Sequence, residues 1–140
     1  MVVNEGIPYY EPGSRITCRA HSVKVIGKRF VSVAANKDPG ARELEADPGG
    51  TGGNVRVNPA VADDPKCLGV STYDAEIGST TTVVRGGFVV PVTAGVALVF
   101  GDPIGPGANG KAVKPGASAK VWGISLSDAA VDQDAIVALY

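Results

Sequence analysis

Leucine, histidine and cysteine are scarce in this sequence of 140 residues. It contains 5 Leu against 21 Val and 7 Ile. Leu is a good helix former, whereas β-branched side chains are stiff at the first torsion and fit a pleated strand better than a helix. The scarcity of Leu therefore excludes a helical bundle and a coiled coil. The 19 Gly and 10 Pro favour many short strands joined by tight turns.

Long apolar runs and an export signal are also missing. No stretch approaches the roughly 18 apolar residues that a membrane-spanning helix needs. The first residues, MVVNEG, lack the basic start and the apolar run of a signal peptide. We therefore expect no membrane partner and a reducing compartment, in which Cys18 and Cys67 stay free thiols buried as small apolar side chains.

A strong net charge and a large set of aromatic rings are absent as well. The net charge is -1 and aromatic residues make up 6% of the chain, so we expect no direct nucleic-acid partner. The charge is nevertheless uneven: residues 1–42 hold 7 Lys and Arg against 3 Asp and Glu, and residues 43–140 hold 6 against 11. A basic N-terminal third facing an acidic partner and an uneven solvated surface both explain this distribution.

The sequence contains no recognisable set of catalytic residues. His21 is the single histidine, which leaves a catalytic triad or a zinc site without a full set of groups. Asp63–Asp64 and Asp132–Asp134 lack the spacing of a calcium loop. The stretch GPGANG at 105–110 matches a phosphate-binding loop, but Pro115 follows too soon for the helix that such loops require. We therefore predict a turn there, and no enzyme activity, metal or cofactor.

Short segments rich in Val or Thr and bounded by Gly, Pro or Asp predict a small single-domain β-barrel or β-sandwich of about ten mostly antiparallel strands. The predicted strands are 15–18, 22–26, 29–35, 54–58, 67–72, 80–85, 88–92, 96–100, 111–114, 120–127 and 135–140. Residues 1–14 predict an extended N-terminal arm, and residues 15–140 one β domain with a loop insertion at 36–66. Asp38–Pro39 predicts at most one short helix in that insertion.

One short pattern occurs twice. The sequence LGVSxxDA at 68–75 returns as WGISxxDA at 122–129, and an apolar strand follows each copy. Strand, turn and strand segments share a limited chemistry, so the sequence alone leaves both duplication and coincidence open.

Several Gly- and Val-rich motifs follow one another in a characteristic order. They are EPGSRIT (11–17), KRFVSVA (28–34), GVSTYDAEIG (69–78), GGFVVP (86–91), AGVALV (94–99), GDPI (101–104), GKAV (110–113) and VWGIS (121–125). This order resembles that of the capsid cement, or head decoration, proteins of tailed bacteriophages. The resemblance covers residues 10–35 and 67–140, and the insertion at 36–66 departs from it.

The resemblance implies a structural virion protein that binds the outer surface of an assembled phage capsid and bridges neighbouring major capsid proteins. It implies a homotrimer at threefold or quasi-threefold positions, located on the capsid exterior and assembled in the host cytoplasm. We expect the arm to make the contact, because aromatic rings suit interfaces and an extended segment can add a strand to a neighbouring sheet. The expected capsid-binding residues are Ile7, Pro8, Tyr9, Tyr10, Glu11, Arg15 and Ile16.

A carbohydrate- or ligand-binding β module of a phage fibre or adhesin is the alternative function. Such a module needs aromatic side chains clustered around a cleft. Trp122 is the single tryptophan and has apolar neighbours in a predicted strand, so we expect it in the core.

Overall fold

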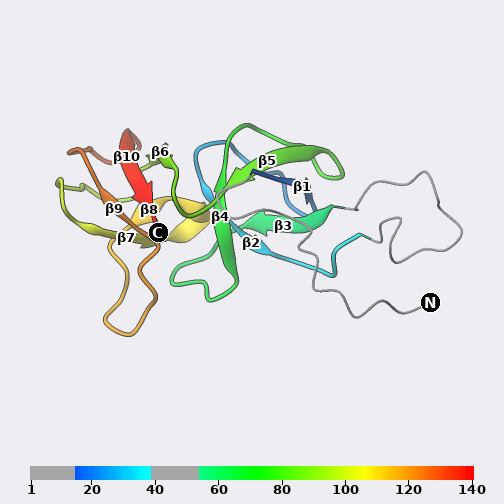
Figure 1. Ribbon diagram of the computed structural model, residues 1–140, viewed down its shortest axis with the longest axis horizontal. Coiled ribbons are helices and arrows are strands. Elements are labelled where there is room, and N and C mark those ends of the chain that lie inside the picture. Colours follow the sequence, from blue (N-terminus) through cyan, green and yellow to red (C-terminus); the bar gives the residue numbers. More distant parts are fainter. Residues whose placement is uncertain (1–14, 39–53) are drawn as a thin grey trace, which may run out of the picture.

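The structure of the protein is a computed structural model that describes residues 15–38 and 54–140. Over these residues it is all-β, as predicted, and its strands form two groups that lie side by side (Figure 1). The first group contains β1 (Ile16–Ala20), β2 (Phe30–Val33), β3 (Val55–Pro59), β4 (Cys67–Ser71) and β5 (Thr80–Val84). The second contains β6 (Val89–Thr93), β7 (Pro103–Pro106), β8 (Ala112–Val113), β9 (Gly123–Ser125) and β10 (Asp134–Leu139), with the 3₁₀ turn η1 (Ala108–Gly110) before β8.

The first group, which we call the barrel unit (residues 16–84), is a closed barrel in the order β1-β3-β2-β4-β5. Strands β1 and β3 pair in parallel, and the other neighbours pair antiparallel. Alternate residues of β1 are buried, which is the period expected of a strand with one face in a core. The interior is filled by Ile16, Cys18, Ala20, Val25, Val31, Val57, Ala75 and Val83.

The second group, the sheet unit (residues 89–139), is a five-stranded sheet in the order β6-β10-β9-β7-β8. Its paired strands are antiparallel. A parallel bridge between Ala94, just after β6, and Ala112 on β8 connects the two edges of the sheet. The sheet therefore curls back on itself.

The two units have the same topology. When β6, β8, β7, β9 and β10 are matched to β1, β3, β2, β4 and β5, each strand neighbour and each parallel or antiparallel relation agrees. The loop contacts also agree: the Gly27 amide donates to Asp74 at 2.8 Å, and the Phe100 amide donates to Asp128 at 2.9 Å. The repeated pattern at 68–75 and 122–129 therefore marks a duplicated structural unit.

The barrel unit completes the sheet unit at the seam between them. Beyond the Ala94 bridge, β6 and β8 do not pair in the described residues, and the start of β2 lies there instead. The Thr93 amide donates to the Lys28 carbonyl oxygen at 2.9 Å. Gly110 approaches Phe30 so closely that a Cβ atom would overlap the Phe30 carbonyl oxygen. The Phe30 ring is fully buried and belongs to the same apolar core as the interior of the sheet unit.

Opposite charges also face each other across the seam. Lys28 Nζ lies 2.8 Å from Asp134 Oδ2. A hydrogen bond from Lys111 and its charge lower the pKa of Asp132, and the charge of Arg29 in the barrel unit adds to this effect. Part of the basic excess of the N-terminal third therefore faces acidic groups of the same chain.

Three strand assignments differ from the predictions. Segments 22–26 and 96–100 contain single bridges, at Val25 and Leu98, and no strand. Their apolar alternation arises because these two residues point inward from loops. Residues 103–106 form β7, which was not predicted because Pro and Gly usually end strands, whereas 107–110 is the expected turn. The arm at 1–14 and most of the expected helix lie outside the described residues, so the domain division stays a prediction.

Candidate functional site

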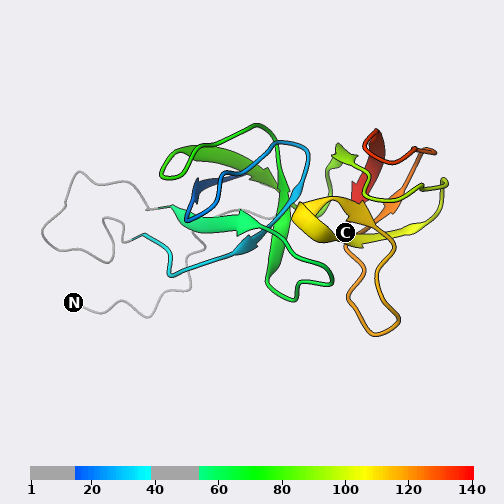
Figure 2. The same cartoon turned by 180° about the vertical axis from the view of Figure 1, so that it is seen from behind.

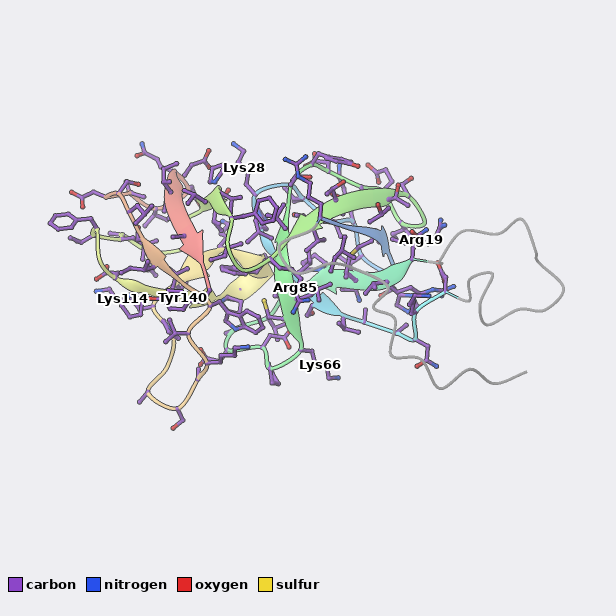
Figure 3. The ribbon with its side chains drawn as sticks, in the orientation of Figure 1. Arg19, Lys28, Lys66, Arg85, Lys114 and Tyr140 are labelled. Carbon is purple, nitrogen blue, oxygen red and sulfur yellow. The ribbon has the colours of Figure 1, made fainter. Side chains whose placement is uncertain are left out.

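A shallow cleft lies on the seam, and we call it the seam cleft. Figure 3 shows Arg85 in the middle of the molecule, with Tyr140 to one side and Lys66 below it. The cleft has a volume of about 70 Å³. Its walls include Leu68, Arg85 and Gly86 from the barrel side and Lys120, Trp122 and Tyr140 from the sheet unit.

The chain crosses from β5 to β6 beside the seam cleft, and glycine allows it to pass close to the end of β10. A Cβ atom at Gly86 would overlap the carbonyl oxygen of Tyr140. The Gly87 amide donates to the Leu139 carbonyl oxygen at 3.0 Å, so the crossing is tied to β10. Figure 2 shows from behind that the crossing segment connects the two units.

Two cations near the seam lie over aromatic rings. Lys120 Nζ is 4.0 Å from the centroid of the Trp122 ring. Arg15 Cζ is 6.0 Å from the centroid of the Phe88 ring, which follows Gly87 in the crossing. A ring attracts a cation and restricts its position without cancelling its charge. With Arg85 and Lys120 among its lining residues, the seam cleft combines positive charge with the apolar side chains of Leu68 and Trp122.

Trp122 is half-buried at the cleft and packs against the core of the sheet unit. The prediction of a core tryptophan is therefore correct for part of the ring only. It immediately precedes β9, where the Tyr140 amide donates to its carbonyl oxygen at 3.0 Å.

The acids that suggested calcium binding have structural roles. The Asp64 carboxylate accepts hydrogen bonds from the amides of Val61 and Lys66, and Asp63 accepts one from Gly116. Asp132 and Asp134 form the ion pairs with Lys111 and Lys28. In the described parts of the chain, no three His, Cys, Asp or Glu side chains gather as a metal site would require.

Comparison with known proteins identifies the family. The family model described as "Phage cement protein" matches residues 11–139. The chain belongs to the phage cement protein family. This is a structural, non-enzymatic family of the phage virion head, so the absence of an enzyme activity is confirmed at the level of the family.

The fold of this cement protein is also found in a solved structure. The crystal structure of the head fiber gp8.5 N base in bacteriophage phi29 matches with a TM-score of 0.65 and 19% sequence identity. The match covers 91% of this chain and 93% of that chain. At this identity the likeness concerns the fold alone. No curated protein sequence matches the chain significantly.

Of the expected capsid-binding residues of the cement protein, the structure describes Arg15 and Ile16. Arg15 is exposed beside Phe88, whereas the Ile16 side chain is buried in the barrel interior. Ile16 therefore holds β1 in place, and Arg15 is the residue of the two that a partner can reach. Ile7, Pro8, Tyr9, Tyr10 and Glu11 lie outside the described residues.

A second candidate surface is the end of the sheet unit opposite the barrel unit (Figure 1). The loops 94–102 and 126–133 meet there through the bridge between Leu98 and Ala129. We call this surface the apolar rim; its exposed apolar side chains are Val96, Val99, Phe100, Leu126 and Val131. The matching place in the barrel unit carries the ion pair between Lys24 and Glu76, where the sheet unit has two alanines.

Both cysteines are free and buried, as predicted. Burial raises the pKa of the Cys18 thiol to about 12. Burial and the nearby charge of Asp64 raise the pKa of Cys67 to about 12 as well. The thiols are therefore protonated at neutral pH and act as small apolar side chains. The described residues include no helix with the length and apolar character needed to span a membrane.

The sequence did not point to the cleft residues Arg85 and Lys120 or to Lys66, which precedes β4. They are separated by 19 and 35 positions in the chain and share no motif. The closest signal was the GGFVVP segment at 86–91, which marks the crossing between the units. The fold brings the ends of the two units together at this crossing. Short sequence patterns do not show which ends of the units meet.

Proposed function

We propose that this cement protein binds the outer surface of an assembled phage capsid and stabilises the shell by bridging neighbouring major capsid proteins. The family match over residues 11–139 is the observation that carries the proposal. The seam supports it, because a continuous core joins the two units into a body suited to holding two neighbours at a fixed spacing. The apolar rim supports it too, since exposed apolar patches often mark protein interfaces.

We further propose that the protein acts as a homotrimer at threefold or quasi-threefold positions of the capsid exterior, after assembly in the host cytoplasm. The arm residues Ile7 to Glu11, followed by Arg15, are the proposed capsid contact. The exposure of Arg15 supports this assignment. Ile16, in contrast, contributes by anchoring β1 in the barrel.

Sedimentation with expanded capsids that lack the protein tests the proposal. We expect the full chain to sediment with the capsids, and a chain lacking residues 1–14 to bind more weakly. Capsids carrying the full chain should also resist heating better than bare capsids. A full chain that stays in the supernatant overturns capsid binding, and equal binding of the shortened chain overturns the role of the arm.

The alternative of a carbohydrate-binding module finds little support in the described residues. Tyr73 and Phe100 are exposed on different units, and Tyr140 is exposed beside Trp122 in the seam cleft. The face of Trp122 is covered by Lys120. This leaves Tyr140 as the open ring of the cleft, and a sugar-binding platform needs several open rings, so we do not propose this function.

A further inference from the structure

We propose that the seam cleft is a docking site for an acidic polypeptide segment of a binding partner, with Arg85 and Lys120 as its main contacts. This inference rests on the proposed function, for which it names the surface and the chemistry of the partner. The docking site differs from the proposed arm contact, because Arg85 and Lys120 come from distant parts of the chain that the folded structure brings together.

The distribution of ion pairs singles out this cleft. Six of the twelve Lys and Arg side chains of the described residues form an ion pair with an acid of the chain. These pairs are Arg19 and Arg56 with Asp38, Lys24 with Glu76, Lys28 with Asp134, Lys111 with Asp132, and Lys114 with Asp102. Arg29 lies near Asp132, and Lys37 also has an interaction.

The cations without an acidic partner in the described residues lie at the seam. They are Arg15, Lys66, Arg85 and Lys120. Arg85 and Lys120 line the cleft, and Lys66 precedes β4, whose residues Leu68 and Gly69 also line it. A protein that pairs its cations elsewhere but leaves a group of them unpaired at one cleft presents a positive surface to a partner.

Asp63 and Asp64 lie on the loop before β4 and form no ion pair with these cations in the described residues. Their carboxylates accept hydrogen bonds from backbone amides instead. Asp64 is buried, with 8% of its surface exposed. Lys120 is held over Trp122, so its position is restricted while its charge stays available.

The apolar part of the cleft indicates a polypeptide. Leu68 and the exposed Tyr140 line the cleft together with the charged groups and offer contact to an apolar side chain. A partner segment with carboxylates and an apolar residue matches both parts of the surface. Nucleic acid fits less well, because a strand stacks its bases on several open rings, and with Trp122 covered by Lys120 the cleft offers Tyr140.

Charge reversal tests the site on capsids. We expect Arg85→Glu/Lys120→Glu to reduce binding to expanded capsids roughly tenfold. Lys24→Glu/Lys114→Glu is the control, since it reverses two exposed cations that neither line the cleft nor pair across the seam; it should change binding by less than about twofold. Circular dichroism confirms that the variants fold, and Arg85→Gln/Lys120→Gln replaces the first variant if it does not fold. If the wild type binds and the cleft variant binds as well as the control, the docking site is overturned and the proposed function stands.

A capsid-free measurement separates the two proposals if the wild type fails to bind capsids. Fluorescence anisotropy compares three probes: a peptide of Glu and Leu, the same peptide with Gln in place of Glu, and a DNA duplex. We expect binding of the Glu peptide, weakened at high salt and lost in the cleft variant. This result supports the docking site even if capsid binding fails. No binding of the Glu peptide, or tighter binding of DNA, overturns the acidic polypeptide as the occupant.

Discussion

The carboxylate of Asp38 accepts hydrogen bonds from two arginines, Arg19 on β1 and Arg56 on β3. These arginines are direct partners in the parallel β1–β3 pair. Like charges directly opposite each other destabilise a sheet, so Asp38 offsets a repulsion that the strand register creates. The side chain of Asp38 is 16% exposed, which makes this the least exposed carboxylate among the ion pairs of the described residues.

We expect Asp38→Asn to destabilise the protein by about 1–2 kcal/mol at pH 7. Desolvation opposes the charged form, but the hydrogen bonds and charges of Arg56 and Arg19 outweigh it and lower the pKa of Asp38 below its ordinary value of 3.8. The stabilisation by the Asp38 carboxylate is therefore complete above pH 3.8, the pKa of the unfolded chain. It is lost as the pH falls through the lower pKa that Asp38 has in the folded protein. Urea denaturation of both proteins across this range measures the difference.

Glu76→Gln is the control for Asp38. Glu76 pairs with Lys24, and its side chain is 74% exposed, so its removal should cost less than about 0.5 kcal/mol. A loss of stability in Asp38→Asn that is no larger than in the control would contradict the role assigned to Asp38.

The sequence predicts a strand at 15–18 and a buried Cys18, and both agree with β1. It does not predict that β1 continues to the buried Ala20 or that Ile16 faces the barrel interior. It does not predict Asp38, which appears as a helix cap when only its neighbours Pro39 and Gly40 are considered. The carboxylate joins strands that are distant in the chain, and the pairing that creates its role is a property of the fold.

At the scale of elements, the glycine of the repeated pattern has a physical explanation. A Cβ atom at Gly69 would overlap the Val84 carbonyl oxygen, and one at Gly123 would lie 2.6 Å from the Ala138 carbonyl oxygen. Both glycines therefore allow the close approach of the next strand in the matched topology. The sequence shows that the pattern repeats, but only the strand pairing shows why glycine is required at its second position.

The units join at Gly110, where β2 of the barrel unit meets the turn before β8. Gly110 and Gly87 both have a left-handed φ, of 72° and 95°. A Cβ atom at Gly87 meets open space, whereas one at Gly110 overlaps the Phe30 backbone. We expect Gly87→Ala to cost about 1 kcal/mol for backbone strain alone. Gly110→Ala should cost at least about 2 kcal/mol more, because the seam must also separate.

Urea denaturation of the two alanine variants measures the difference between them. Since the strain is similar at both positions, the difference isolates the contact across the seam. Equal losses would show that Gly110 does not hold the units together.

At the scale of the whole molecule, one apolar core crosses the boundary between the units. Phe30, Val70 and Val84 come from the barrel unit, and Val92 and Val137 from the sheet unit. The sequence predicts a single β domain but not its construction from two matched halves. The first half is a closed barrel, whereas the second half lacks a long β6–β8 pairing and has the start of β2 of the first half in its place. The repeated sequence pattern does not show this difference.

This construction predicts that the two units unfold together. Val83→Ala removes a fully buried side chain of the barrel interior, on the far side of β5 from the shared core. If the seam makes one cooperative body, this change must reduce the stability of the sheet unit by the same amount, about 2 kcal/mol. Hydrogen exchange followed by mass spectrometry gives the opening free energy of each segment. We expect equal reductions in β1 and in β10. A reduction confined to the barrel unit would show two independent bodies, and a body that hinges at the seam cannot hold two capsid subunits at a fixed spacing.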